Sequence, residues 1–114
     1  MAEKFRKIEA YRDHFSDFLS QQKQTVKDKI YWTLTLIEEM PRVSETYLKK
    51  LEGTESLFEV RVQFGSDIFR IFCFFDEGKL IILLNGFQKK TQKTPRREIE
   101  RALRLREEYY AEKS

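Results

Sequence analysis

Apolar and polar residues alternate with a period of two in the middle of the chain. Between Leu57 and Phe64 every second residue is apolar, and Glu59, Arg61 and Gln63 occupy the positions between them. A period of two is typical of a strand that buries one face and exposes the other. The pattern therefore predicts a strand whose polar face carries Glu59 and Arg61 side by side.

Two apolar runs follow this strand at Ile68–Phe75 and Lys79–Asn85. The segments between the three runs, 65–67 and 76–78, are short and contain Gly, Ser and Asp. Because turns of this length join antiparallel neighbours, the sequence predicts a three-stranded meander. The last two runs are so apolar that the sheet is expected to be covered at least partly on both faces.

Helical spacing of apolar residues appears on both sides of the meander. It predicts a short helix over 12–21 and a longer one from about Val26, which Pro41 ends near Met40. These two consecutive helices are expected to form a hairpin, with Trp32 in the core. A last helix is expected to begin near Pro95.

The remaining segments carry weaker patterns. Residues 5–10 are predicted to be a first strand, and residues 42–52 a connector with at most one helical turn near Tyr47. The predicted order is strand, two helices, three strands and a helix. This order indicates an α+β fold with a small, mostly antiparallel sheet, and the length fits one domain over 1–114.

Positive charge is concentrated near the C-terminus. Residues 86–114 hold nine Lys and Arg against five Asp and Glu, although the whole chain has a net charge of only +3. The segment Phe87–Arg97 contains no acid. A cationic loop between a buried strand and a helix is suited to phosphate oxygens, so RNA is the expected target. The residues expected to contact RNA are Lys89, Lys90, Thr91, Lys93, Arg96 and Arg97.

The cysteine and histidine content excludes several kinds of site. Cys73 is the only cysteine, so an intramolecular disulfide and a thiolate-rich zinc site are excluded, and a small buried side chain is expected. His14 is the only histidine, which excludes a pair of histidines as acid and base. The sequence shows neither a signal-peptide core nor a membrane span, so a cytoplasmic location is expected.

The chain resembles the RelE/ParE superfamily of bacterial toxins, and most closely its phage-related, HigB-like branch. The resemblance lies in Leu57–Arg61, Ile68–Phe72 and Leu84–Pro95, together with the order of elements. It implies the toxin of a type II toxin–antitoxin pair, an endoribonuclease (mRNA interferase) that cuts mRNA on the ribosome without a metal or cofactor. It also implies a HigA-like antitoxin with a helix-turn-helix domain as partner.

Arg61 and Arg70 are the expected catalytic cations, because a guanidinium presents a fixed fork to two phosphate oxygens. Glu59 is a candidate base, and Lys90 or Lys93 a candidate for proton transfer. Arg61 could instead form an ordinary surface pair with Glu59, and Arg70 a structural ion pair. Two rival functions also stay open, namely a ParE-like inhibitor of DNA gyrase and a plain nucleic-acid-binding module.

Overall fold

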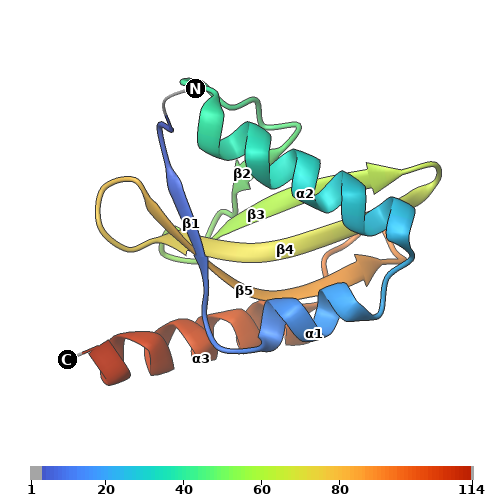
Figure 1. Ribbon diagram of the computed structural model, residues 1–114. Coiled ribbons are helices and arrows are strands. Elements are labelled where there is room, and N and C mark those ends of the chain that lie inside the picture. Colours follow the sequence, from blue (N-terminus) through green and yellow to red (C-terminus); the bar gives the residue numbers. More distant parts are fainter. Residues whose placement is uncertain (1–3, 114) are drawn as a thin grey trace.

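The computed structural model describes residues 4–113 and has an α+β architecture, in which a five-stranded sheet lies between helices (Figure 1). The strands run in the order β1-β5-β4-β3-β2 across the sheet. The elements along the chain are β1 (Lys7–Ala10), α1 (His14–Ser20), α2 (Gln24–Glu39), β2 (Leu48–Lys50), β3 (Phe58–Phe64), β4 (Asp67–Phe75), β5 (Leu80–Lys89) and α3 (Arg96–Lys113).

The predicted meander is confirmed as β3, β4 and β5, which pair antiparallel through their short turns. β1 pairs with β5 in parallel, with Lys7 opposite Leu80. The two helices that follow β1 are joined by residues 21–23 and pack on one face of the sheet, α1 against β5 and α2 against β3. None of the described helices is long and apolar enough to cross a membrane.

The prediction of a connector without a strand over 42–52 is wrong at Leu48–Lys50, which forms β2 along the free edge of β3. Leu48 lies opposite Val60, and Lys50 lies opposite Phe58. The chain reverses between the strands through Glu55 and Ser56, which have positive φ angles of 52° and 70°. A three-residue strand with two lysines has almost no periodic signal, so only the pairing reveals it.

β5 also extends further than predicted, to Lys89 rather than Asn85. An irregularity shifts its register against β4, since Ile71 pairs with Gly86 whereas Cys73 pairs with Leu83. A bulge of this kind redirects a side chain and increases the local twist. Here the Asn85 amide donates hydrogen bonds to the backbone oxygen and Oε1 of Glu98 in α3, at 3.2 and 3.0 Å.

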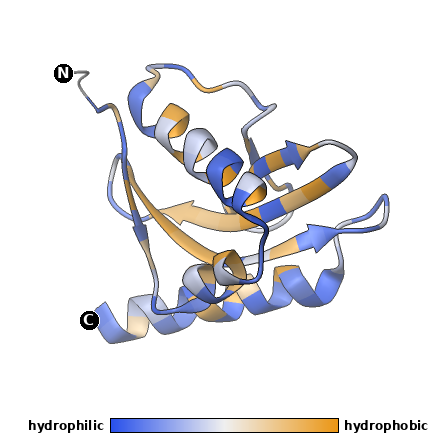
Figure 2. Cartoon of the chain, turned by 45° about the vertical axis from the view of Figure 1, so that its right-hand side comes forward, coloured by the Kyte–Doolittle hydropathy of each residue, from blue (hydrophilic) through white to orange (hydrophobic). Residues whose placement is uncertain are grey.

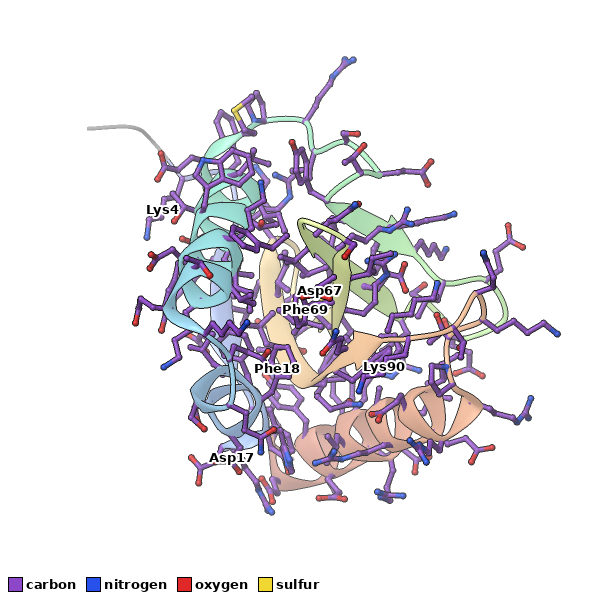
Figure 3. All side chains as sticks on the ribbon, turned by 90° about the vertical axis from the view of Figure 1, so that its right-hand side faces the viewer. Lys4, Asp17, Phe18, Asp67, Phe69 and Lys90 are labelled. Carbon is purple, nitrogen blue, oxygen red and sulfur yellow. The ribbon has the colours of Figure 1, made fainter. Side chains whose placement is uncertain are left out.

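Both faces of the sheet are covered, as the apolar runs predicted. Figure 2 shows hydrophobic strands with largely hydrophilic outer helix surfaces, and Figure 3 shows α1 and α2 on one side of the sheet and α3 on the other. The side under α1 and α2 contains Cys73, which is fully buried as predicted. The side under α3 includes Leu57, Phe72, Phe74, Ile82, Leu84, Phe87, Ala102 and Leu105.

Gly86 lets α1 approach β5 closely. A Cβ atom at position 86 would lie 2.6 Å from the Phe18 ring, closer than real Cβ contacts come. Phe18 in turn contacts the Phe69 ring edge-on, with ring centroids 6.4 Å apart, and both are labelled in Figure 3. The absent side chain at Gly86 therefore makes room for the aromatic core under α1.

The prediction that Trp32 lies in the core is wrong, because its side chain is 49% exposed. α2 presents Val26, Ile30 and Ile37 to the sheet, and Trp32 lies off that stripe. The indole instead contacts Tyr47 of the connector, with ring centroids 5.7 Å apart. The prediction rested on the residue type, since large aromatic side chains are mostly buried, and not on the helical spacing, which Trp32 does not share.

The end of α3 is fastened to the turn between β4 and β5. Asp76 accepts hydrogen bonds from the Tyr109 hydroxyl at 2.6 Å and from Lys113 Nζ at 2.7 Å. Burial works against the charged form of Asp76, but these two hydrogen bonds outweigh it and hold the pKa of that carboxyl below its ordinary value. The hydrogen bond to Asp76, together with burial, raises the pKa of Tyr109 to about 12.

Asp76→Asn is expected to reduce the acid dependence of stability. An Asp in an unfolded chain titrates near pH 3.9. Because the pKa of Asp76 is lower when folded, its stabilisation is complete above that pH and is lost as the pH falls through the folded pKa. We expect the variant to melt roughly 5 °C lower at pH 7 and to lose less further stability below about pH 4. Thermal unfolding from pH 2 to 7 measures both effects, and parallel profiles for the two proteins would contradict this account.

Candidate functional site

Cross-strand register brings the two predicted arginines together. Arg61 on β3 lies directly opposite Arg70 on β4, so their side chains leave the same face of the sheet. The next row on this face contains Gln63, Ile68 and Lys89. The antiparallel hairpin therefore places two guanidinium groups next to each other, with Lys89 on the same face one strand further across.

Glu59 holds the two arginines in place. Its Oε2 lies 3.4 Å from Nε of Arg61 and 3.4 Å from Nε of Arg70. The side chains of Glu59 and Arg70 are each 7% exposed, whereas that of Arg61 is 31% exposed. One buried carboxylate thus serves two cations, and the three charges together leave a net charge of +1.

The terminal nitrogens of the arginines are only partly engaged. Nη1 of Arg61 donates to the Glu45 carbonyl at 3.3 Å, and Nη1 of Arg70 donates to the Phe69 carbonyl at 3.1 Å. Within residues 4–113, Nη2 of each arginine has no hydrogen-bond partner. Each side chain is therefore anchored on one side and retains a donor group for a ligand.

A pocket of about 380 Å³ opens over the pair. Its lining residues are Lys29, Thr46, Tyr47, Arg61, Val62, Gln63 and Arg70. Three of these side chains are cations and none is an acid, because Glu59 lies behind the arginines and does not line the pocket. Such a lining is electrostatically suited to a phosphate group.

The charge of Arg70 is costly to bury and is partly compensated. Burial lowers the pKa of its guanidinium, Glu59 raises it, and the neighbouring Arg61 lowers it further. Two adjacent cations with one counter-ion store electrostatic repulsion, which an incoming anion relieves. The geometry therefore favours a ligand with negative charge.

A larger hollow of about 550 Å³ lies elsewhere, between the turn 53–56 and α3. Arg106 in its wall already donates to the carbonyl oxygens of Thr54 and Glu55, at 3.2 and 2.9 Å. Glu107 adds a negative charge to the same wall. The smaller pocket over Arg61 is thus better suited to a phosphate than the larger hollow.

The predicted basic segment divides into parts with different roles in the fold. Phe87 is buried against Phe72, with ring centroids 5.3 Å apart. Lys89 ends β5, and Lys90 follows it near the β3–β4 turn at Asp67 (Figure 3). In the loop, the Thr91 hydroxyl donates to the Lys93 carbonyl at 2.8 Å.

The helical end of this segment is exposed. Arg96 pairs with Glu100 at 3.0 Å on the surface of α3, and Arg97 is also exposed. The structure therefore brings Glu59, Arg61 and Arg70 into one cluster and places Lys89 on their face. The residues that line the pocket include neither Lys89 nor Lys90 nor Lys93.

Sequence reasoning missed Lys29, Thr46 and Tyr47 as parts of this pocket. Lys29 lies on α2, whose pattern predicted only a helix that packs on the sheet, and the other two lie in the segment predicted to be a connector. Neither segment has a recognisable motif. The only local feature was Tyr47 in the connector, and the sequence did not indicate which residues it would contact.

Among the described residues, no group of three His, Cys, Asp or Glu side chains could hold a metal ion.

No curated protein matches the chain. A family described as phage-derived protein Gp49-like (DUF891) matches residues 17–107, a segment that contains all the predicted site residues. The expected relationship to RelE/ParE-like toxins is thereby confirmed, whereas the HigB-like branch stays a prediction. The chain belongs to the Gp49-like family of phage-derived proteins, a family of RelE/ParE-like toxins.

Proposed function

We propose that this toxin is an endoribonuclease that cuts mRNA on the ribosome and so stops translation. The observation that carries the proposal is the pair Arg61 and Arg70, held side by side by Glu59 at the wall of an open, cationic pocket. Inhibition of gyrase through protein contacts does not require a phosphate-directed cluster of this kind. The family also implies an antitoxin partner, which we propose to be a HigA-like helix-turn-helix protein.

The arginine pair suits the chemistry of RNA cleavage by an internal nucleophile. A ribose 2′-oxygen attacks the adjacent phosphorus, a P–O bond to the 2′-oxygen forms, and the bond to the 5′-oxygen breaks. Negative charge accumulates on the non-bridging oxygens as the phosphorane forms. The free Nη2 groups of Arg61 and Arg70 would donate to these oxygens, which is the type of stabilisation that contributes most to many enzymes.

Glu59 acts in this proposal as a positioning residue. Its Oε2 faces both Nε atoms and it does not line the pocket, so it orients the guanidinium groups without touching RNA. Its Oε1 is buried without a hydrogen-bond partner among the described residues. The alternative role of Glu59 as a base stays a prediction.

The basic segment would hold the RNA backbone beside the pocket. Lys89 shares the face of the arginines, and Lys90, Thr91 and Lys93 lie in the loop that follows. We propose that these residues, with Arg96 and Arg97, contact phosphates of mRNA or ribosomal RNA. Lys90 or Lys93 as the proton-transfer group stays a prediction, because neither lines the pocket.

Production of the chain in bacteria without an antitoxin is expected to arrest growth and to leave cuts within the coding regions of mRNA. The reason is that the pocket would engage mRNA presented in extended form by the ribosome. Primer extension on abundant messages maps the cuts, and purified ribosomes with a defined mRNA test whether cleavage requires the ribosome. Arg104→Ala, a change at an exposed arginine of α3, is the control and is expected to cut normally.

Growth arrest with intact mRNA would contradict this proposal. A DNA-damage response that depends on gyrase would then favour the ParE-like function. Binding to RNA without cuts in either assay would favour a nucleic-acid-binding module.

A further inference from the structure

The pocket over the arginines has an aromatic wall as well as a cationic one. Tyr47 lines it directly, and the Tyr47 carbonyl oxygen accepts a hydrogen bond from the backbone N–H of Arg61 at 2.8 Å. The tyrosine is therefore fixed at the backbone level to the strand position that carries the catalytic cation. A ligand bound at Arg61 has this aromatic residue as its immediate neighbour.

Contacts from α2 hold this wall in place. The Trp32 ring meets the Tyr47 ring nearly edge-on, with centroids 5.7 Å apart and planes at 68°. Lys29 Nζ lies 4.5 Å from the centroid of the Trp32 ring, within cation–π range. Trp32 thus contacts both Tyr47 and Lys29, two of the three pocket residues that do not belong to the sheet.

A cationic floor beside an aromatic wall matches the two parts of a nucleotide. Single-stranded RNA is commonly recognised by bases that stack on aromatic side chains while cations contact the backbone. A stacked base also needs space next to its phosphate, and a pocket of about 380 Å³ is within the range of small-ligand sites.

We propose that Tyr47 is a stacking platform for one unpaired RNA base, and that Lys29 contacts a phosphate next to that nucleotide. Arg61 and Arg70 hold the adjoining phosphate at the other wall of the pocket. This inference rests on the proposed function and adds to it a base-binding subsite outside the predicted basic segment. It also gives a physical role to the exposed Trp32, whose ring contacts the Tyr47 ring and so limits its movement.

The test uses single-stranded RNA of about eight nucleotides with 2′-O-methyl groups, which cannot be cleaved by attack of a 2′-oxygen. A series of otherwise identical oligonucleotides each lacks one base. Binding to the full chain is measured by fluorescence anisotropy. We expect one abasic position to weaken binding to the wild-type protein by about tenfold or more, the loss expected when one stacked base is removed.

Tyr47→Ala is expected to weaken binding to the intact RNA by the same factor and to make the protein indifferent to that abasic position. Tyr47→Phe, which keeps the ring, should bind like the wild type, and Tyr47→Leu should behave like the alanine variant without leaving a void. Tyr31→Ala is the matched control, because Tyr31 is an exposed aromatic residue of the same helix as Lys29 and does not line this pocket. Lys29→Ala should weaken all the oligonucleotides equally and make the slope of log affinity against log salt shallower by about 0.7.

The proposal is overturned if Tyr47→Ala binds the intact RNA as the wild type does. It is equally overturned if the variant loses the same factor on every abasic RNA, since the base would then not be in contact with Tyr47. These outcomes differ from failure of the proposed function. A protein that shows base-dependent binding through Tyr47 but leaves mRNA intact on ribosomes would disprove cleavage and keep the subsite.

Discussion

Arg61→Ala is expected to lower the single-turnover rate of mRNA cleavage by about 100-fold or more while the protein stays folded. Arg61 would hold the phosphate and stabilise the further charge that develops in the transition state, so a loss should remain in the cleavage rate when binding to ribosomes is saturated. Its side chain is 31% exposed, and its backbone pairing with Tyr47 does not depend on the side chain. Rapid-quench measurements with saturating protein on programmed ribosomes determine the rate, and circular dichroism checks the fold.

Arg61→Lys sharpens this test. A lysine keeps the charge but lacks the planar fork, so it cannot bind Glu59 and a phosphate oxygen at the same time in the same way. We expect the lysine variant to remain well below the wild-type rate. If Arg61→Ala cuts mRNA at the wild-type rate, the arginine pair is not the catalytic centre.

Arg70→Ala is expected to lower the free energy of unfolding by roughly 3 kcal/mol, at the lower end of the range for breaking a buried ion pair. The substitution leaves the Glu59 carboxylate buried with only Arg61 beside it, and it also removes packing from a side chain that is 7% exposed. Urea unfolding measures the loss. A variant as stable as the wild type would show that Arg70 makes no net contribution to stability.

A double variant separates stability from catalysis for the ion pair of Glu59 and Arg70 taken together. Arg70→Met with Glu59→Gln replaces the buried charges with side chains of similar size, which is often neutral for stability. We expect it to recover most of the stability lost in Arg70→Ala and to remain inactive in cleavage. Normal cleavage by the folded double variant would remove Arg70 from the site and leave it a structural role.

The central strands and the two arginines on them could be predicted because the patterns that indicate them lie within short stretches of sequence. Strict alternation places Glu59 and Arg61 on one face of β3, and a short turn before Asp67 limits the possible registers of β4. Only the actual register, however, shows that Arg61 faces Arg70. The two could equally have been offset by one pair, with one of them pointing into the core under α1 and α2.

The parts that sequence could not supply depend on long-range contacts. β2 has three residues, two of them lysines, and forms because the edge of β3 is available. The pocket wall made by Lys29 and Tyr47 forms only because α2 and the connector lie close together beside β3. The residue pattern of neither segment predicts this contact. Sequence reasoning therefore found the cations on the sheet and missed the aromatic residue beside them.

The parallel pairing of β1 with β5 has a consequence for synthesis of the toxin. β1 lies at the edge of the sheet, its neighbour is β5, and Lys7 meets Leu80, 73 positions later in the chain. A contact of such long range cannot form in a nascent chain until residues 80–83 have left the exit tunnel, and closing so long a loop is slow. By then β3 and β4, with Arg61 and Arg70, have already emerged. Closure of the sheet by its first strand is thus deferred until the hairpin of β3 and β4 is outside the ribosome.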